Sequence, residues 1–365
     1  MHPLLILTLL AGVPFLLVLA YVFLRGSTSL RRYVLTRIAL TVPMVVILAS
    51  VVFFVMRILP GDPVTSSLGP RGTPALRQQL QAQLGLDEPL IIQYFSFLGD
   101  VVTFDFGNAL TSGRRPILDE LGERFPATIE LILPAAIFAL VVGVAAGTFA
   151  AARRRGSSDY GLRMASVAVY SMPIFWLGLL LQLIFGVRLG WTPVAGRIDP
   201  VVGLGLERRT NLLVVDSIIS RNWDALGSAL LHLVLPTLTL GLVLAAVFLR
   251  LTRINVIEEL QRDYVTSARA RGIRERIVVY KHSLKNALIP IVTLIGLQIA
   301  ILLAGAVLTE TVFSWPGVGR YLVDRISLRD YTAVQSVVTV FAVLVALISL
   351  AVDIIYSLLD PRVRY

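Results

Sequence analysis

The chain has 365 residues, of which 56% are hydrophobic and only 15% are charged, and its mean hydropathy is +0.80. A soluble domain carries about 25% charged residues, so this composition excludes a soluble protein and indicates a polytopic membrane protein. The absence of cysteine excludes disulfides and thiolate-bound metals, and the net charge of +10 does not indicate nucleic acid binding, because the arginines gather at the ends of apolar segments.

Two apolar segments open the chain. Residues 4–24 reach the ~20 residues that a membrane span needs. A secretory signal peptide is the alternative, but the arginines follow this segment, at 25–37, instead of preceding it. This order predicts a spanning helix with its N-terminus outside. Residues 39–59 predict a second span, followed by a turn signal in the sequence Pro60-Gly61-Asp62-Pro63.

Residues 64–126 are polar and predict a small extracytoplasmic helical subdomain. Thr73-Pro74 is typical of a helix start, and further short helices are expected at 89–99 and 116–125. The side of the membrane follows from parity. One span separates the region from the arginines at 25–37, and the following span separates it from the triplet Arg153 to Arg155. Both arginine groups are expected inside, so the region is expected outside.

Three more spans are expected before the next basic region. They are residues 127–152, 164–187 and 231–249. The second contains Pro173, which neighbouring helices can tolerate by satisfying the freed backbone groups. Residues 188–230 predict an outer loop of mixed charge without a chemical motif.

The densest basic segment is residues 263–290, between two apolar stretches, and it is therefore expected on the cytoplasmic side. Residues 263–271 predict a short helix with Asp263 as N-cap and Gly272 at its C-terminus. A second helix is expected over about 276–286, leading to Pro290. A short helix on a glycine hinge is a shape that docks into a groove of another protein.

The sixth and seventh of these spans are expected at 287–308 and 333–352. Between them, residues 309–331 predict a re-entrant or surface loop with a Pro-Gly turn. Glu310, at the edge of a span, is expected to face the bundle or water, because a carboxylate facing lipid is costly.

Four motifs, in this order along the chain, resemble the permeases of ABC importers for dipeptides, oligopeptides or nickel. They are LPGDP at 59–63, the basic segment at 263–290, VFSWPGVG at 312–319 and DPRVRY at 360–365. In such permeases the basic segment corresponds to the cytoplasmic EAA loop, which inserts its helix into a separate ATPase. The resemblance covers about residues 31–365, and Tyr321 and Arg325 depart from its pattern.

The resemblance implies an all-α polytopic membrane protein, with a six-helix ABC-importer permease core, one extra N-terminal transmembrane helix and the small extracytoplasmic subdomain. The implied parts are 1–30 (extra helix), 31–63 (first core helix), 64–126 (subdomain) and 127–365 (permease core with coupling loop 253–286). Predicted ATPase-coupling residues are Asp263, Tyr264, Thr266, Ser267, Ala268, Arg269, Arg271 and Gly272. Motif-loop residues are Pro60, Gly61, Asp62, Pro63, Glu310, Phe313, Pro316, Gly317 and Gly319.

The function implied is that of a multi-pass transport subunit in the bacterial inner membrane. Its implied partners are a second permease, two cytoplasmic ATPases, an extracytoplasmic solute-binding protein and the lipid bilayer, with no nucleic acid. ATP and Mg²⁺ are expected on the ATPases and no cofactor or metal in this chain, since Lys281 and Lys285 lie in no phosphate-binding loop. Peptide is the expected substrate, with nickel, glutathione or oligosaccharide as alternatives within the family.

Two other classes remain as alternatives. An ion-coupled transporter usually carries ionisable groups at the bilayer midplane, whereas here Glu130, His232, Glu310 and Asp353 lie near the ends of spans. An intramembrane enzyme is disfavoured because the chain has no HExxH or GxSxG motif and no cysteine. The chain itself is therefore not expected to be an enzyme.

Overall fold

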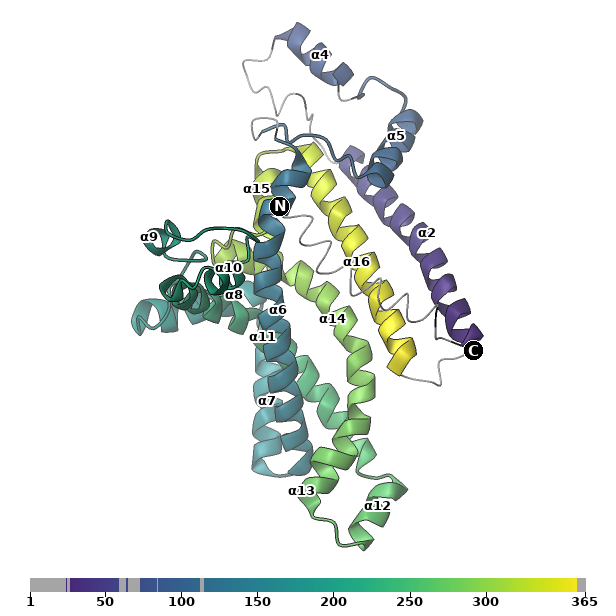
Figure 1. The fold of residues 1–365 in the computed structure, drawn as a ribbon, viewed down its shortest axis with the longest axis vertical. Coiled ribbons are helices and arrows are strands. Elements are labelled where there is room, and N and C mark those ends of the chain that lie inside the picture. Colours follow the sequence, from purple (N-terminus) through teal and green to yellow (C-terminus); the bar gives the residue numbers. More distant parts are fainter. Residues whose placement is uncertain are drawn as a thin grey trace. The chain divides into compact units, whose positions relative to one another are not determined.

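The computed structural model describes residues 24, 27–58, 64, 73–83, 85–111 and 115–359, and within these ranges it is helical without a β-sheet (Figure 1). Four helices are long and apolar enough to cross a membrane, and a bent helix pair makes a fifth candidate span. The structure thus confirms an all-α polytopic membrane protein. The predicted helix at 4–24 and the motifs at 59–63 and 360–365 lie outside the described residues.

The chain forms two compact units. The first combines residues up to Pro126 with Gly317–Ala351, and the second combines Ala127–Pro316 with Val352–Arg364. Sequence order therefore does not separate them, because a C-terminal segment belongs with the N-terminal part.

The first unit is built on α2 (Thr28–Ile58), α5 (Leu90–Thr103), α15 (Val318–Ser327) and much of α16 (Tyr331–Leu359), and it also contains the short α4 (Pro74–Gln83). The predicted spans at 39–59 and 333–352 lie in α2 and α16. Aromatic rings fill the core, where Phe53 stacks on Phe97 with centroids 5.5 Å apart. The predicted start of α4 is confirmed, since the hydroxyl of Thr73 accepts a hydrogen bond from the backbone N–H of Leu76 at 3.3 Å.

Helix α6 (Ile117–Ala152) corrects one prediction. A short helix over 116–125 and a separate span over 127–152 were expected, but a single helix of 36 residues covers both. Pro126 lies inside it. A proline removes one backbone hydrogen bond and crowds the preceding turn, which weakens a helix at that point but does not always end it.

The predicted span over 164–187 is wrong as a single straight helix. α7 (Ser157–Ser171) ends before Pro173, and the chain then turns by 106° into α8 (Ile174–Leu181) and the π-helical segment η2 (Gln182–Arg188). The physical reason is steric. A residue before proline avoids the helical region, and Met172 is extended, with φ −81° and ψ 133°.

The second unit is centred on α11 (Trp223–Glu259), a helix of 37 residues that contains the predicted span at 231–249. It packs against α7, α8 and α14 (Leu284–Val312), which contains the predicted span at 287–308. Two glycines of α6 let this helix approach α11 closely. A Cβ atom at Gly143 would lie 2.5 Å from the Cβ of Phe248, and one at Gly147 would lie 2.6 Å from the backbone oxygen of Leu249. Small residues four apart commonly mark such close helix contacts in membranes.

The predicted outer loop over 188–230 contains two short helices, α9 (Pro200–Gly203) and α10 (Leu213–Ile219). α10 packs against α11. Leu206, Leu213 and Ala225 form a small apolar core there, which makes this loop a folded part of the second unit.

Candidate functional site

The segment singled out by its basic charge lies at the end of the second unit where α11 ends and α14 begins (Figure 1). The predicted short helix is confirmed as α12 (Asp263–Ala270). The second predicted helix, over 276–286, is not a separate element. Helical structure runs from α13 (Glu275–Ile277) through the π-helical segment η3 (Val278–Ser283) directly into α14. Within residues 263–290, α12 is therefore the one helix that is separate from the long helices.

The inner side of α12 is held by a small apolar core. Val265 and Ala268, one turn apart, are 0% and 2% exposed and pack with Val278 of η3. Leu260 and Ile273 border this core. Burial of a valine side chain stabilises a fold by roughly 1.5–3 kcal/mol, so these contacts fix which side of α12 faces outward. Ala268, one of the predicted coupling residues, faces this core.

Gly272 ends α12 in the way its sequence position predicts. Its φ is +73°, in the left-handed region. Its N–H donates to the backbone oxygen of Arg269 at 2.9 Å, and the N–H of Ile273 donates to that of Ala268 at 3.2 Å. This pair of bonds is the Schellman motif, and the contact of Ile273 with the apolar core completes it.

The predicted N-cap of α12 is wrong. Arg262 occupies the cap position, and Asp263 is the first helical residue, without a side-chain hydrogen bond to the helix end. A carboxylate in the first turn still interacts favourably with the helix dipole. Asp263 thus supports the helix through its charge.

Two side chains of α12 form hydrogen bonds with carboxylates of neighbouring segments. Arg269 donates two hydrogen bonds to Glu275, at 3.1 and 2.6 Å, and this bonding lowers the pKa of the Glu275 carboxyl. The hydroxyl of Tyr264 donates to Glu259, near the end of α11, at 2.7 Å. Burial, followed by this contact, raises the pKa of Tyr264.

The outward side of α12 carries small residues together with one carboxylate, that of Asp263, which lies three and four positions before Thr266 and Ser267 and so shares their face. Thr266, Ser267 and Ala270 are exposed on it, with Tyr264 beside them at 37% exposure. Asp263, Arg269, Arg271 and Gly272 are exposed as well. Such a surface suits contact with another protein. No group of three or more potential metal-ligating side chains occurs in the described part of the chain.

The predicted motif loop at 309–331 begins with a buried carboxylate. Glu310, near the end of α14, is 0% exposed and accepts a hydrogen bond from Thr128 at 2.6 Å. This confirms that Glu310 faces the helix bundle. Nearby, Phe313 is buried among leucines, and the indole of Trp315 donates to the backbone oxygen of Ala127 at 2.8 Å. The remaining motif residues lie at the start of α15, where Pro316 precedes the cap residue Gly317, and Gly319 is buried within the helix.

Comparison with known proteins identifies the family. Residues 143–365 match the family described as "Binding-protein-dependent transport system inner membrane component", and residues 30–132 match the N-terminal part of the same kind of membrane component. The chain belongs to this family. The permease is thus a multi-pass protein of the bacterial inner membrane, as its resemblance implied.

Curated relatives cover nearly the whole permease. A "Di/tripeptide transport system permease protein DppB" of Pseudomonas aeruginosa is 43% identical over 334 residues, which is 91% of this chain and 98% of the relative. A "Dipeptide transport system permease protein DppB" of Escherichia coli is 40% identical over 92% of this chain and 99% of its own length. A "Glutathione transport system permease protein GsiC" of Escherichia coli K12 is 37% identical over 91% of this chain and 99% of its own length.

Two ionic clusters in the permease were missed by sequence reasoning. In the second unit, Glu130 and Arg197 form a buried ion pair in which Arg197 Nε lies 2.8 Å from the carboxylate. The backbone N–H of Val214 donates to the same carboxylate at 2.7 Å. Glu130 inside an apolar segment was a usable signal, but its partner lies 67 positions away in a loop without a motif.

In the first unit, the two departures from the family pattern meet. Tyr321 donates a hydrogen bond to the buried carboxylate of Glu120, and Arg325 lies 3.5 Å from the same residue. Arg325 also donates to Thr111 at 2.6 Å, and Thr111 donates to Asp330. Burial, followed by the bond to Glu120, raises the pKa of Tyr321. The two substitutions therefore belong to one buried polar network.

Proposed function

We propose that this permease is a membrane subunit of an ATP-driven importer of dipeptides and tripeptides. The observation that carries the proposal is its 43% identity, over 91% of the chain, to a di/tripeptide transport permease. A family member of this kind works with other components of a transport system. Here these are a second permease that completes the transport path, two cytoplasmic ATPases, which carry ATP and Mg²⁺, and an extracytoplasmic solute-binding protein.

The ATPase contact is assigned to α12. Three features support this assignment: α12 stands apart from the long helices, its inner side is fixed by Val265 and Val278, and its outer side exposes the small residues Thr266 and Ser267. A short rigid helix with small outward residues can lie deep in a groove of a partner. Its anchoring means that a displacement of α12 also displaces η3.

The experiment for the substrate is uptake by the reconstituted importer. The permease, its partner permease, the ATPases and the binding protein are assembled in vesicles, and ATP-dependent uptake of a labelled dipeptide is measured with glutathione as competitor. We expect dipeptide uptake that excess unlabelled dipeptide abolishes. Uptake of glutathione in place of the dipeptide would support the second candidate function, which the 37% identity to a glutathione permease favours.

A matched pair of variants tests the contact at α12. In Ser267→Trp, a large side chain on the outward side of α12 is expected to block docking, so that ATPases no longer co-purify with the permease. Ser327→Trp places the same side chain at an exposed position of α15 and is expected to leave co-purification unchanged. Equal recovery of ATPases with both variants would contradict the assignment.

A further inference from the structure

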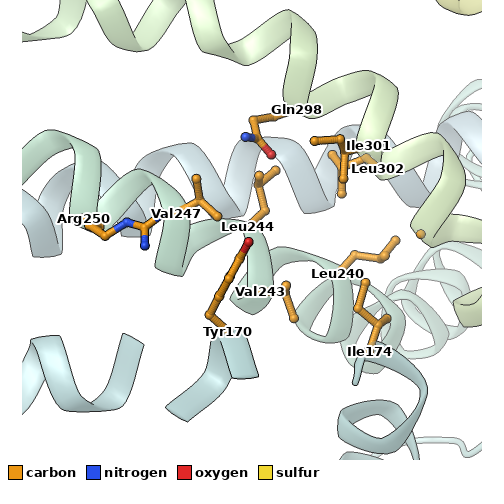
Figure 2. A pocket seen from close by; sticks show the side chains of 11 residues that line it. Tyr170, Ile174, Leu240, Val243, Leu244, Val247, Arg250, Gln298, Ile301 and Leu302 are labelled. Carbon is orange, nitrogen blue, oxygen red and sulfur yellow. The ribbon is translucent and has the colours of Figure 1, made fainter. Parts of the chain in front are cut away.

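The second unit contains a hollow of about 230 Å³ between α7, α8, α11 and α14 (Figure 2). Of the 11 residues that line it, three have polar side chains and the others are apolar or glycine. Tyr170 and Gln298 enter it from opposite sides, from α7 and α14, and Arg250 extends along it from α11 (Figure 2). Polar groups of three kinds thus converge within an otherwise apolar wall.

Arg250 has no acidic partner within ion-pair distance among the described residues. Its nearest described interaction is with the ring of Tyr170, whose centroid lies 5.8 Å from the guanidinium carbon. Arg253, one turn further along α11, is different, since it donates to both carboxylate oxygens of Asp159 at 2.6 and 2.8 Å. One arginine of this helix is therefore engaged in a structural ion pair, while its neighbour is available.

The two other polar groups are also available. The described residues provide no hydrogen-bond partner for the hydroxyl of Tyr170 or the side-chain amide of Gln298. A guanidinium next to an apolar stretch of a membrane helix is costly if it faces lipid, which makes it a candidate functional group. Tyr170 is 55% exposed and Arg250 is exposed too, so the hollow is open and can admit water, or a solute that replaces water.

Arginine is the side chain best suited to hold a carboxylate, because its planar N–H groups can donate two parallel hydrogen bonds. At about 230 Å³, the hollow has room for several water molecules, or for one end of a short peptide in their place. A phenol and an amide nearby can exchange hydrogen bonds with peptide groups, and the apolar wall accepts side chains of varied shape.

We propose that this hollow is a station on the transport path, where Arg250 receives the carboxylate of the transported peptide and where Tyr170 and Gln298 hydrogen-bond to its amide groups. The choice of a peptide as the ligand rests on the proposed function. The contact is transient, because a path that held its solute tightly would not release it.

The first test measures the electrostatic effect of Arg250 on a thiol placed in the hollow, and it makes no assumption about the substrate. The chain has no cysteine, so the Gln298→Cys variant carries a single thiol. In the assembled complex, the rates of its reaction with a negatively and a positively charged methanethiosulfonate reagent are compared, with labelling read on this chain after separation from its partners. We expect the anionic-to-cationic rate ratio to fall at least about fivefold when Arg250→Gln is added.

Two controls accompany this test. Arg154→Gln removes an exposed arginine outside the hollow and is expected to leave the ratio at position 298 unchanged. Val201→Cys places a thiol on the exposed surface of α9, where Arg250→Gln is expected to have no effect. An unreactive thiol at position 298, or a ratio that does not respond to Arg250→Gln, would overturn the proposal.

The second test addresses the peptide. In reconstituted vesicles with saturating binding protein, Arg250→Gln is expected to lower dipeptide uptake at least tenfold while ATP hydrolysis changes less than twofold. Arg250→Lys, which keeps the charge, is expected to retain at least a third of the uptake. Normal uptake by Arg250→Gln would refute the role of Arg250. If the unaltered complex transports no peptide, the proposed function and the peptide ligand both fail, and the rate ratio alone decides whether the hollow accepts anions.

Discussion

Replacement of Gly272 is expected to uncouple ATP hydrolysis from transport. Its φ of +73° is a conformation that residues with a side chain rarely adopt, yet a Cβ atom there would meet no heavy atom within 4 Å. The effect of a substitution is therefore due to backbone strain alone and not to a clash. A residue with a Cβ costs ~1–2 kcal/mol in this conformation, and a β-branched residue costs more.

This strain acts on the two Schellman hydrogen bonds that end α12. If Gly272→Val disfavours the seated conformation of α12 by ~2 kcal/mol, the fraction of permease ready to dock decreases by up to about 30-fold, since 1.4 kcal/mol corresponds to a factor of ten. The protein should remain in the membrane, because the apolar cores of the long helices are untouched. ATP hydrolysis then continues with much less uptake.

The assay is the ratio of peptide uptake to ATP hydrolysis in reconstituted vesicles, for three variants at position 272. Asparagine tolerates positive φ best among residues with a Cβ, so the expected order of coupling is glycine, asparagine, alanine and then valine. Gly227→Ala, at an exposed helical glycine of α11 with open space around it, is the control and is expected to behave like the unaltered protein. Normal coupling in Gly272→Val, or equal loss in the asparagine and valine variants, would refute the reasoning.

Three further predictions concern topology, stability and the N-terminus. A cysteine in place of Ser96, exposed on α5, should react with an impermeant thiol reagent in intact cells, and labelling only after permeabilisation would reverse the topology. Glu130→Ala should destabilise the purified complex by about 3–5 kcal/mol in thermal unfolding, because it leaves Arg197 buried without its carboxylate, and the double variant with Arg197→Met should recover much of this loss. Deletion of residues 2–24 should preserve assembly and uptake at matched expression, because the arginines at 25–37 still hold the next span in place; normal assembly with loss of uptake would reveal a role for that segment.

Most of the helical framework could be predicted from the sequence because its signals are local. A run of about 20 apolar residues has few conformations available in a bilayer, so the spans now found in α2, α6, α11 and α16 were identifiable one at a time. The end of α12 could be predicted in the same way, because the signal is the glycine itself, which adopts a positive φ without steric cost.

The errors have a different origin, because they depend on what surrounds a residue. A proline inside an apolar helix can be absorbed, as at Pro126, or can break the helix, as at Pro173, and the outcome depends on neighbouring helices. The pairing of Glu130 with Arg197 joins positions far apart in the chain, and periodicity carries no information about such a contact.

The close contact of α6 with α11 bears on how force travels through this protein. Where the two backbones touch at Gly143 and Gly147, no layer of adjustable side chains separates them, so the pair resists sliding and responds as one stiff rod. Pro236 lies inside α11, and at a rise of ~1.5 Å per residue the part of α11 from Pro236 to its end at Glu259 measures about 35 Å. α12 is attached at one end of this rod, and Arg250 lies about two and a half turns before that end. A tilt of about 5° at the α12 end would displace the other end of this part by about 3 Å, so that a small movement at α12 becomes a larger one deeper in the membrane.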